Sequence, residues 1–303
     1  MRTMMKPTVV AALLTLAGAM AHAECTLNSG NEGFSPYREN FAIFNQMYNN
    51  GWADKDETAM RVQYSTKYSF YGCDVHKLTN TDHDKGDFFL SYTGLFDFYM
   101  LSRYSDPVIN RMSNIGLHYR LPVSLTTFLN RGWLEVAVEH RSDGQVFEPG
   151  DGSNAATLEQ AYQKADASAR RLFDTLSRGS NYLSLQARWE TTASPGLFRF
   201  RASSHEYFSQ NTEVTWGPLK NQGRTIRDYD LAQLGVEYEH ENIGTLGVYW
   251  RVGSAGLKAD SFDLMWHFPK TPLMLRGHVG PMNTLSNYTQ PQNSIGFGLL
   301  FFN

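Results

Sequence analysis

Residues 133–145 read WLEVAVEHRSDGQ, and their alternation of apolar and polar side chains decides the fold. Leu134, Val136 and Val138 are apolar, whereas the positions between them carry acidic or small residues. A repeat of two residues is the signature of a β-strand with one apolar face and one polar face. The apolar stripe continues into His140 and Ser142, so this strand ends in a base and a hydroxyl on its apolar face.

The same alternation recurs along the chain, in segments of about ten residues that are separated by turn residues. A first strand is expected near 34–46, and the apolar, aromatic run NSIGFGLLFF before Asn303 is expected to be the last. Segments between them include 58–72, 88–100, 111–122, 132–143, 180–189, 197–208, 229–240, 257–268 and 273–283. They predict about twelve strands, an even number as bacterial membrane barrels require.

The connections between these segments alternate in length. Tight connections lie at 192–196, 241–244 and 269–272, and long ones lie around 144–179 and 209–228. Short turns at one end and long loops at the other are typical of outer-membrane barrels, and only a closed barrel satisfies every strand backbone in lipid. A soluble β-sandwich would show the same alternation, but the connections favour an all-β fold, a twelve-stranded antiparallel transmembrane β-barrel.

The composition agrees with a membrane barrel. Aromatic residues make up 14% of the chain, with 16 Tyr and 19 Phe, which suits aromatic girdles at the membrane interfaces. The formal net charge is −3 and no basic cluster is present, so nothing indicates a nucleic-acid partner. Beyond the N-terminal segment, no run approaches the ~20 apolar residues of a membrane-spanning helix.

The N-terminal segment has the pattern of a secretory signal. Arg2 and Lys6 precede the apolar run VVAALLTLAGAM, which ends in the small-residue sequence AHA. A membrane anchor helix is the alternative, but the run is short. We therefore expect a signal peptide over 1–23, a barrel over 24–303, and a location in the bacterial outer membrane.

Two other features belong to the exported chain. Cys25 and Cys73 can form one disulfide that ties the N-terminal arm to the first turn, and two unpaired thiols are the alternative. The connection 144–179 contains ATLEQAYQKADASARRLFD, which is rich in helix formers. We expect a long extracellular loop there with a short helix.

Three polar side chains are expected to meet on the outer wall. Glu135 and Glu139 suit a polar barrel interior, so His140 and Ser142 must face lipid, where polar groups are costly and indicate function. Asn181 ends the outward apolar stripe of 180–189 in the same way. If the two strands pair through the connection 144–179, Asn181 can lie beside His140.

These three residue types can perform nucleophilic catalysis. A serine needs a base to take its proton, and histidine titrates near neutrality. The carbonyl oxygen of Asn181 can accept the imidazole N–H and hold the ring without adding a charge. The alternative is polar decoration of the membrane interface, where His, Ser and Asn are all tolerated.

The segment His140–Gly144, HRSDG, followed by SRGSNYL at 177–183, resembles the outer-membrane phospholipase A family. That family has a His-x-Ser-Asn-Gly segment and then a Ser-Arg-x-x-Asn segment on the following strand. The segments 31–46, 91–107 and 280–300 also resemble its first strand, its third strand with the following loop, and its last loop and strand. The resemblance covers roughly the whole chain after the signal, in order.

The resemblance implies a twelve-stranded barrel that hydrolyses the acyl ester bonds of phospholipids, with phospholipase A1, A2 and lysophospholipase activity. It implies that Ser142 is the nucleophile, His140 the general base and Asn181 the residue that holds the imidazole. It also implies Ca²⁺ bound between two monomers of a reversible homodimer in the lipid bilayer. The matching ligands are the carbonyls of Ser105 and Gln145 and the hydroxyl of Ser177.

The chain departs from the family pattern at four places. Asp143 replaces the usual asparagine, and Gln145 stands where arginine is common. Gly94 stands where the family has a glutamine that bonds across the dimer, so this chain has no side chain at that position for the bond. The connection 144–179 is much longer than the family gap.

Two other functions fit the same fold. A passive pore or transport barrel would have the same location, but inward side chains such as Glu135, Glu139, Arg141, Arg188 and Glu190 would leave it little channel. A structural or adhesion barrel would bind through its long loops. Such a barrel does not explain why His140, Ser142 and Asn181 occur together on the lipid-facing side.

Overall fold

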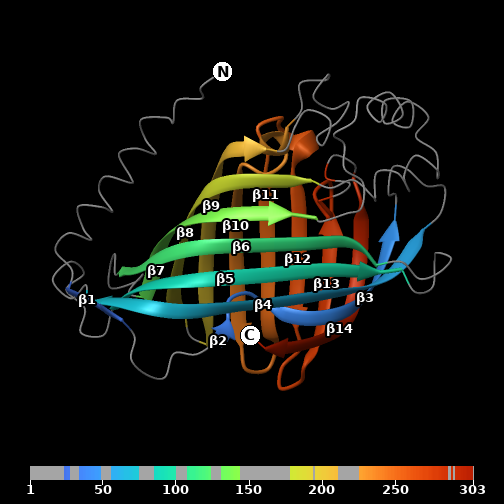
Figure 1. Ribbon diagram of the computed structural model, residues 1–303. Helices are drawn as coiled ribbons and strands as arrows, with labels where there is room; N and C mark the ends of the chain where they lie inside the picture. Colours follow the sequence, from blue (N-terminus) through green and yellow to red (C-terminus); the bar gives the residue numbers. More distant parts are fainter. Residues whose placement is uncertain are drawn as a thin grey trace, which may run out of the picture.

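The structure is a computed structural model, and it describes the chain in segments separated by gaps. The described residues are 24–27, 34–48, 56–74, 85–99, 108–123, 131–143, 178–193, 195–210, 225–285, 288 and 291–302. Their strands form one fourteen-stranded antiparallel sheet, of which twelve strands close into a barrel (Figure 1). Among the described residues, no helix combines the length and apolarity needed to cross a bilayer.

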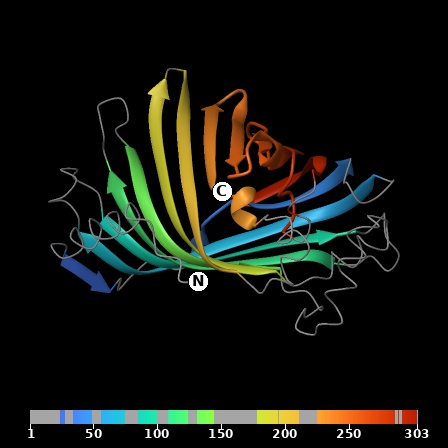
Figure 2. The same cartoon turned by 90° about the horizontal axis from the view of Figure 1, so that it is seen from above.

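Each barrel strand pairs antiparallel with the next along the chain, and β14 pairs with β3 to close the ring. Seen from above, the strands curve strongly along their length (Figure 2), as the tilt and twist of a closed barrel require. The prediction of a twelve-stranded antiparallel barrel is therefore confirmed. The strands are β3 (Asn40–Tyr48), β4 (Glu57–Asp74), β5 (Lys85–Phe98), β6 (Val108–Val123), β7 (Arg131–Ser142), β8 (Gly179–Ala193), β9 (Gly196–Gln210), β10 (Ala232–His240), β11 (Gly244–Val252), β12 (Ser261–His267), β13 (Leu273–Val279) and β14 (Asn293–Phe302).

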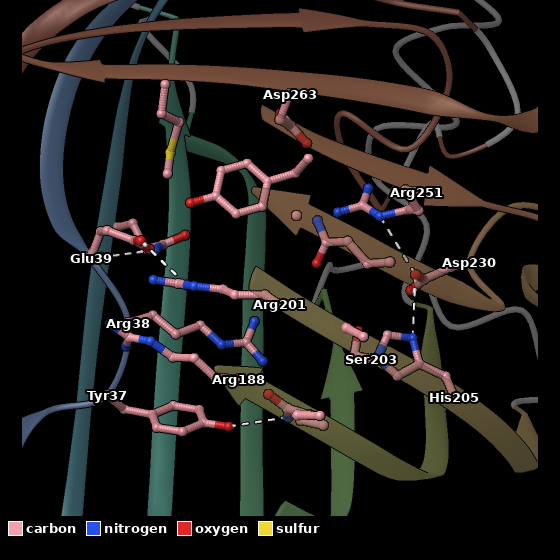
Figure 3. A pocket seen from close by; sticks show the side chains of 18 of the residues that line it. Tyr37, Arg38, Glu39, Arg188, Arg201, Ser203, His205, Asp230, Arg251 and Asp263 are labelled. Carbon is pink, nitrogen blue, oxygen red and sulfur yellow. Dashed lines mark hydrogen bonds and ion pairs between the residues drawn. The ribbon is translucent and has the colours of Figure 1, made fainter. Parts of the chain in front are cut away.

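The expected first strand at 34–46 is in fact two strands. The short strand β2 (Phe34–Pro36) pairs with β4 beyond the end of β3, and the chain leaves the sheet at residues 37–39. The side chains of Tyr37, Arg38 and Glu39 enter the barrel instead (Figure 3). Three large polar residues in succession cannot alternate between lipid and lumen, so the strand breaks.

A further strand, β1 (Glu24–Leu27), pairs with the far end of β4 and brings the two cysteines together in the backbone register. Cys25 lies directly opposite Cys73. Directly opposed residues in an antiparallel pair have Cα atoms about 4.5–5.5 Å apart, within the range that a disulfide spans. The Cys25–Cys73 bond remains a prediction.

The two faces of the barrel wall have opposite polarity, as the alternation predicted. On β7, Leu134 and Val138 are 40% and 53% exposed on the outer face, whereas Glu135 and Glu139 are buried inside. Arg61, Asp97, His118 and Ser184 are likewise buried in the lumen, where ion pairs and hydrogen bonds satisfy them. The outer surface is therefore apolar and the interior is a polar network.

The two ends of the barrel differ as expected. Residues 194–195, 241–243 and 268–272 connect strands at one end, and residues 143–178, 211–231 and 280–292 connect them at the other. We call these the short-turn end and the long-loop end. β3 begins and β14 finishes at the short-turn end, so His140, Ser142 and Asn181 lie at the long-loop end.

Three expected strands are shorter than their alternation suggested. A 3-10 turn, η1 (Ile226–Asp228), precedes β10, and a second, η2 (Leu257–Ala259), precedes β12. β13 stops at Val279 because Gly280 has a φ of 107°, which a strand does not accommodate. The connection 144–177, with its expected helix, lies outside the described residues, as does the expected signal at 1–23.

An apolar cluster lies across the long-loop end of the lumen. Tyr182 on β8 and Tyr207 on β9 point inward and pack against side chains from three connections. The cluster also contains Ile226, Tyr229, Ala259, Met282, Leu285 and Tyr288. Burial of these side chains fixes the loops over the barrel mouth, close to the strand ends that carry His140 and Asn181.

Candidate active site

His140 and Asn181 are in contact on the outer wall of the barrel. They are register partners across β7 and β8, and the Nδ1 atom of His140 lies 2.8 Å from the Oδ1 atom of Asn181. The amide oxygen can only accept, so the contact requires the imidazole proton on Nδ1. Nε2 is then left as the basic nitrogen, and the His140 side chain is exposed.

Ser142 is the last residue of β7 and shares the outer face with His140, two positions away. Its register partners are Gly179 on β8 and Ser113 on β6, and it is partly exposed. Strand geometry therefore brings His140, Ser142 and Asn181 to one face of one strand pair, as the alternation in the sequence predicted.

The apolar surface below these residues is less uniform than expected. The outward stripes of β7 and β8 include Leu134, Val136, Leu183 and Leu185, and of these Leu134 is 40% exposed. Leu183 is only 7% exposed, and Val136 and Leu185 are intermediate. The exposed apolar surface therefore follows β7 and its neighbour β6, where Ile115 and Leu117 are exposed, more than β8.

The backbone of β7 is anchored from the lumen at the residue between His140 and Ser142. The guanidinium of Arg141 donates to the carboxylate of Asp230 at 2.7 Å and to the hydroxyl of Tyr207 at 2.8 Å. Asp230 lies in the connection between β9 and β10, so this ion pair joins the end of β7 to that connection.

Asp230 collects several positive and polar partners. The Tyr207 hydroxyl donates to it at 2.8 Å, and His205 and Arg251 lie 3.3 Å and 3.5 Å from its other oxygen (Figure 3). Burial alone would raise the pKa of Asp230, but the attraction of His205, Arg141 and Arg251 outweighs it and holds the pKa well below its usual range. Asp230 is therefore a negatively charged residue on the lumen side of the site that contacts Arg141, Tyr207, His205 and Arg251.

A second clamp holds the ends of β7 and β8 together just past Ser142. The backbone N–H of Asp143 donates to the carbonyl of Arg178 at 3.0 Å, and the N–H of Arg178 donates to the Asp143 carboxylate at 2.5 Å. Both residues are buried, and the Arg178 guanidinium lies 5.3 Å from the ring centre of Tyr288. The side-chain carboxylate of Asp143, at the position where the family has asparagine, thus accepts a hydrogen bond from a backbone N–H.

The lumen behind the site is crossed by residues 37–39. The Tyr37 hydroxyl donates to Glu135 at 2.9 Å, and Arg38 lies 3.7 Å from Glu139. Glu39 lies 3.7 Å from Arg201 on β9, next to a cavity of about 400 Å³. The N-terminal segment therefore braces β7 from inside.

The three residues expected to bind calcium, Ser105, Gln145 and Ser177, lie outside the described residues. Gln145 follows Asp143 by two positions and Ser177 directly precedes Arg178, the pair that holds the strand ends together. Within the described part of the chain, no group of three or more His, Cys, Asp or Glu side chains could hold a metal.

Sequence reasoning missed three residues around the site. Ser113 ends the outward stripe of Ile115 and Leu117, so the alternation that singled out His140 could also have found it. Tyr92 lies on the outer face of β5 and bonds Ser113. Asp230 had no such signal, because it lies in a connection whose path the alternation does not describe.

Solved structures of known proteins share the fold of this barrel. No family model and no curated protein matches the chain. Among solved structures, it is similar to Escherichia coli outer membrane phospholipase A carrying an active-site substitution, with 16% identity, a TM-score of 0.58, and coverage of 91% of this chain and 94% of that one. A second Escherichia coli structure of that enzyme has 17% identity, a TM-score of 0.57 and coverage of 89% and 94%.

The chain is also similar to the Salmonella typhi outer membrane phospholipase, which is a dimer with bound calcium in that structure. The identity is 16%, the TM-score is 0.57, and the alignment covers 91% of this chain and 94% of that one. The similarity extends over nearly the whole of each protein at low identity. This chain therefore has the barrel fold of the outer-membrane phospholipase A structures.

Proposed function

We propose that this protein is an outer-membrane phospholipase A, which hydrolyses the acyl ester bonds of phospholipids at the outer wall of the barrel. The main support is the 2.8 Å contact between His140 and Asn181 on a lipid-facing surface, beside Ser142 on the same stripe. A base held by an amide next to a hydroxyl is the arrangement that nucleophilic acyl transfer needs.

The proposed reaction has two steps. Ser142 Oγ attacks the ester carbonyl while Nε2 of His140 takes its proton, and the C–O bond to glycerol breaks as His140 returns the proton to the leaving lysophospholipid. Water, deprotonated by His140, then attacks the acyl-serine, and the fatty acid is released as the bond to Ser142 Oγ breaks and His140 returns the proton to that oxygen. Asn181 holds the ring by accepting the Nδ1 proton, and it does not react.

We propose that Ca²⁺ is the cofactor, held by the carbonyls of Ser105 and Gln145 and the hydroxyl of Ser177. All three donors are oxygens, the ligand type that calcium prefers. When bound there, the cation would supply positive charge near the ester oxygen. What this chain contributes is the Asp143–Arg178 clamp, which holds together the strand ends that lead to Gln145 and Ser177.

The proposed setting is the bacterial outer membrane, with the site near the outer leaflet and a reversible homodimer as the active form. The apolar outer face and the unequal ends of the barrel support a membrane location. A second monomer would supply the other wall of a groove over β6 and β7 that holds the acyl chains of the phospholipid. Phospholipids would reach the site by lateral diffusion.

A passive pore is the second candidate, and the interior of the barrel argues against it. The apolar cluster lies across the long-loop end, and residues 37–39 cross the lumen below it. Conductance in planar bilayers separates the two: we expect ester cleavage without sustained conductance, and conductance without cleavage would favour the pore.

A calcium-titrated lipid hydrolysis assay on refolded protein tests the proposal directly. Phospholipid in mixed micelles should release fatty acid with the wild type and not with Ser142→Ala, while both proteins give the same β-sheet circular dichroism. Equal hydrolysis by the two proteins would refute the assignment of Ser142.

A further inference from the structure

A second hydroxyl lies directly opposite the proposed nucleophile. Ser113 on β6 is the register partner of Ser142 on β7. Its neighbour Asn114 is buried in the lumen, whereas Ile115, two positions on, is 53% exposed on the outer face. Ser113 therefore points outward, and side chains opposed in this way lie about 5 Å apart at Cβ.

Ser113 is held by a tyrosine from the next strand. The hydroxyl oxygens of Tyr92 on β5 and Ser113 are 3.2 Å apart. Tyr92 is the register partner of Ile115, so its ring must lean along the wall to reach Ser113. The pair places two hydroxyls beside Ser142, next to the exposed apolar side chains of Ile115 and Leu117 on β6, where unsatisfied polar groups are costly.

Gly94 provides the space for this contact. It is the register partner of Ser113 on β5, and a Cβ atom there would lie 3.3 Å from the Tyr92 ring and 3.0 Å from the Phe96 ring. A Cβ atom at this position would require the neighbouring rings to shift by a few tenths of an ångström. The position where the related family has a glutamine is thus a glycine that lets Tyr92 reach Ser113.

We propose that Ser113, held by Tyr92, binds a second ester carbonyl of a diacyl phospholipid while Ser142 attacks the first. This inference rests on the proposed phospholipase function. The Tyr92 hydroxyl donates to Ser113 Oγ, and the Ser113 hydroxyl donates to the carbonyl oxygen that is not cleaved. The two esters of a diacyl phospholipid are on adjacent glycerol carbons, which matches two serine hydroxyls on adjacent strands.

The role predicts a specific kinetic effect. The uncleaved ester keeps its charge distribution through the reaction, so a hydrogen bond to it stabilises bound substrate and transition state equally. Such a bond acts on KM rather than kcat. A monoacyl lysophospholipid lacks the second ester, so it gains nothing from Ser113.

The experiment compares Ser113→Ala with wild type on diacyl phosphatidylcholine and on monoacyl lysophosphatidylcholine, both in mixed micelles. We expect KM for the diacyl lipid to rise about tenfold, which corresponds to one hydrogen bond of about 1.4 kcal/mol, with kcat nearly unchanged. For the monoacyl lipid both constants should stay within about twofold of wild type.

Two variants complete the test. Tyr92→Phe should raise KM for the diacyl lipid by a smaller factor, and the double variant should be no worse than Ser113→Ala, because Tyr92 acts through Ser113. Ser204→Ala is the matched control, since Ser204 is an exposed outer-face serine on β9. It should leave both substrates unchanged.

Each result is decisive. An unchanged KM in Ser113→Ala, or an equal loss on both lipids, would overturn the role of Ser113 even if Ser142→Ala is inactive and the phospholipase assignment stands. Wild-type protein that hydrolyses neither lipid would overturn the proposed function and this inference together.

Discussion

Arg141 and Asp230 form a part-buried ion pair on the lumen side of the proposed active site, with 2.7 Å between the guanidinium and the carboxylate. Arg141 sits between His140 and Ser142 on β7, so its side chain enters the lumen while theirs face lipid. Tyr207 donates to the same carboxylate oxygen. The end of β7 is therefore fixed from inside by a contact that no lipid can reach.

Loss of this anchor should reduce catalysis by displacing the two outward side chains. We expect Arg141→Ala to lower kcat about tenfold or more with little change in KM, because small misplacements of reacting groups are costly. Arg141→Lys should recover part of the loss, since lysine keeps the charge but does not reproduce the guanidinium contacts with both Asp230 and Tyr207. Steady-state kinetics on micellar phospholipid provide the measurement.

The matched control for that prediction is the ion pair of Arg61 with Asp97. It is buried in the lumen between β4 and β5, with contacts of 2.7 Å and 2.8 Å. Arg61→Ala should destabilise the barrel by about 3–5 kcal/mol, as removal of one partner of a buried pair does, and leave kcat nearly unchanged in the folded fraction. A similar loss of kcat in both variants would show that general destabilisation explains the effect.

Because Asp230 is charged in the folded barrel, part of the free energy of unfolding should depend on pH. Its folded-state pKa lies well below the unfolded value of about 3.9, so its contribution is fully present above that value. The contribution is lost as the pH falls below about 4 and through the folded pKa. Denaturant unfolding in detergent should thus show a stability gap between wild type and Asp230→Asn at pH 7 that narrows in strong acid. A constant gap at every pH would contradict this.

Substitution of the three proposed catalytic residues should lower kcat by different factors. Ser142→Ala and His140→Ala should each lower kcat by about 10³-fold or more, because they remove the nucleophile and the base. Asn181→Ala should cost about 10²-fold, since it orients the imidazole and does not react. Single-turnover fatty-acid release, with circular dichroism as a folding control, measures this order. A loss in Asn181→Ala as deep as that in Ser142→Ala would count against an orienting role.

Removal of calcium should abolish activity without unfolding the barrel. A chelator is expected to stop hydrolysis, and added Ca²⁺ to restore it, because the three proposed ligand positions fall in the sequence between barrel strands and not within them. Ser177→Ala should raise the calcium concentration for half-maximal activity about tenfold, the effect of losing one ligand interaction of about 1.4 kcal/mol. Full activity in excess chelator would exclude the calcium proposal.

Alternation in the sequence was enough to predict the barrel, the facing of β7 and the meeting of His140 with Asn181. A strand has a side-chain period of two, so once β7 and β8 pair through one connection, the residue types on each face follow. The same rule failed at residues 37–39, where three polar side chains in succession leave the sheet.

Only the tertiary structure showed what lies behind and beside these residues. Asp230 reaches Arg141 from a connection, and Tyr92 reaches Ser113 because Gly94 leaves room for its ring. Local periodicity carries information about neighbours on one strand and on the strand that pairs with it. Contacts across the lumen depend on closure of the ring, and the direction in which a side chain extends along the wall depends on packing. Neither can be read from the local pattern of residues.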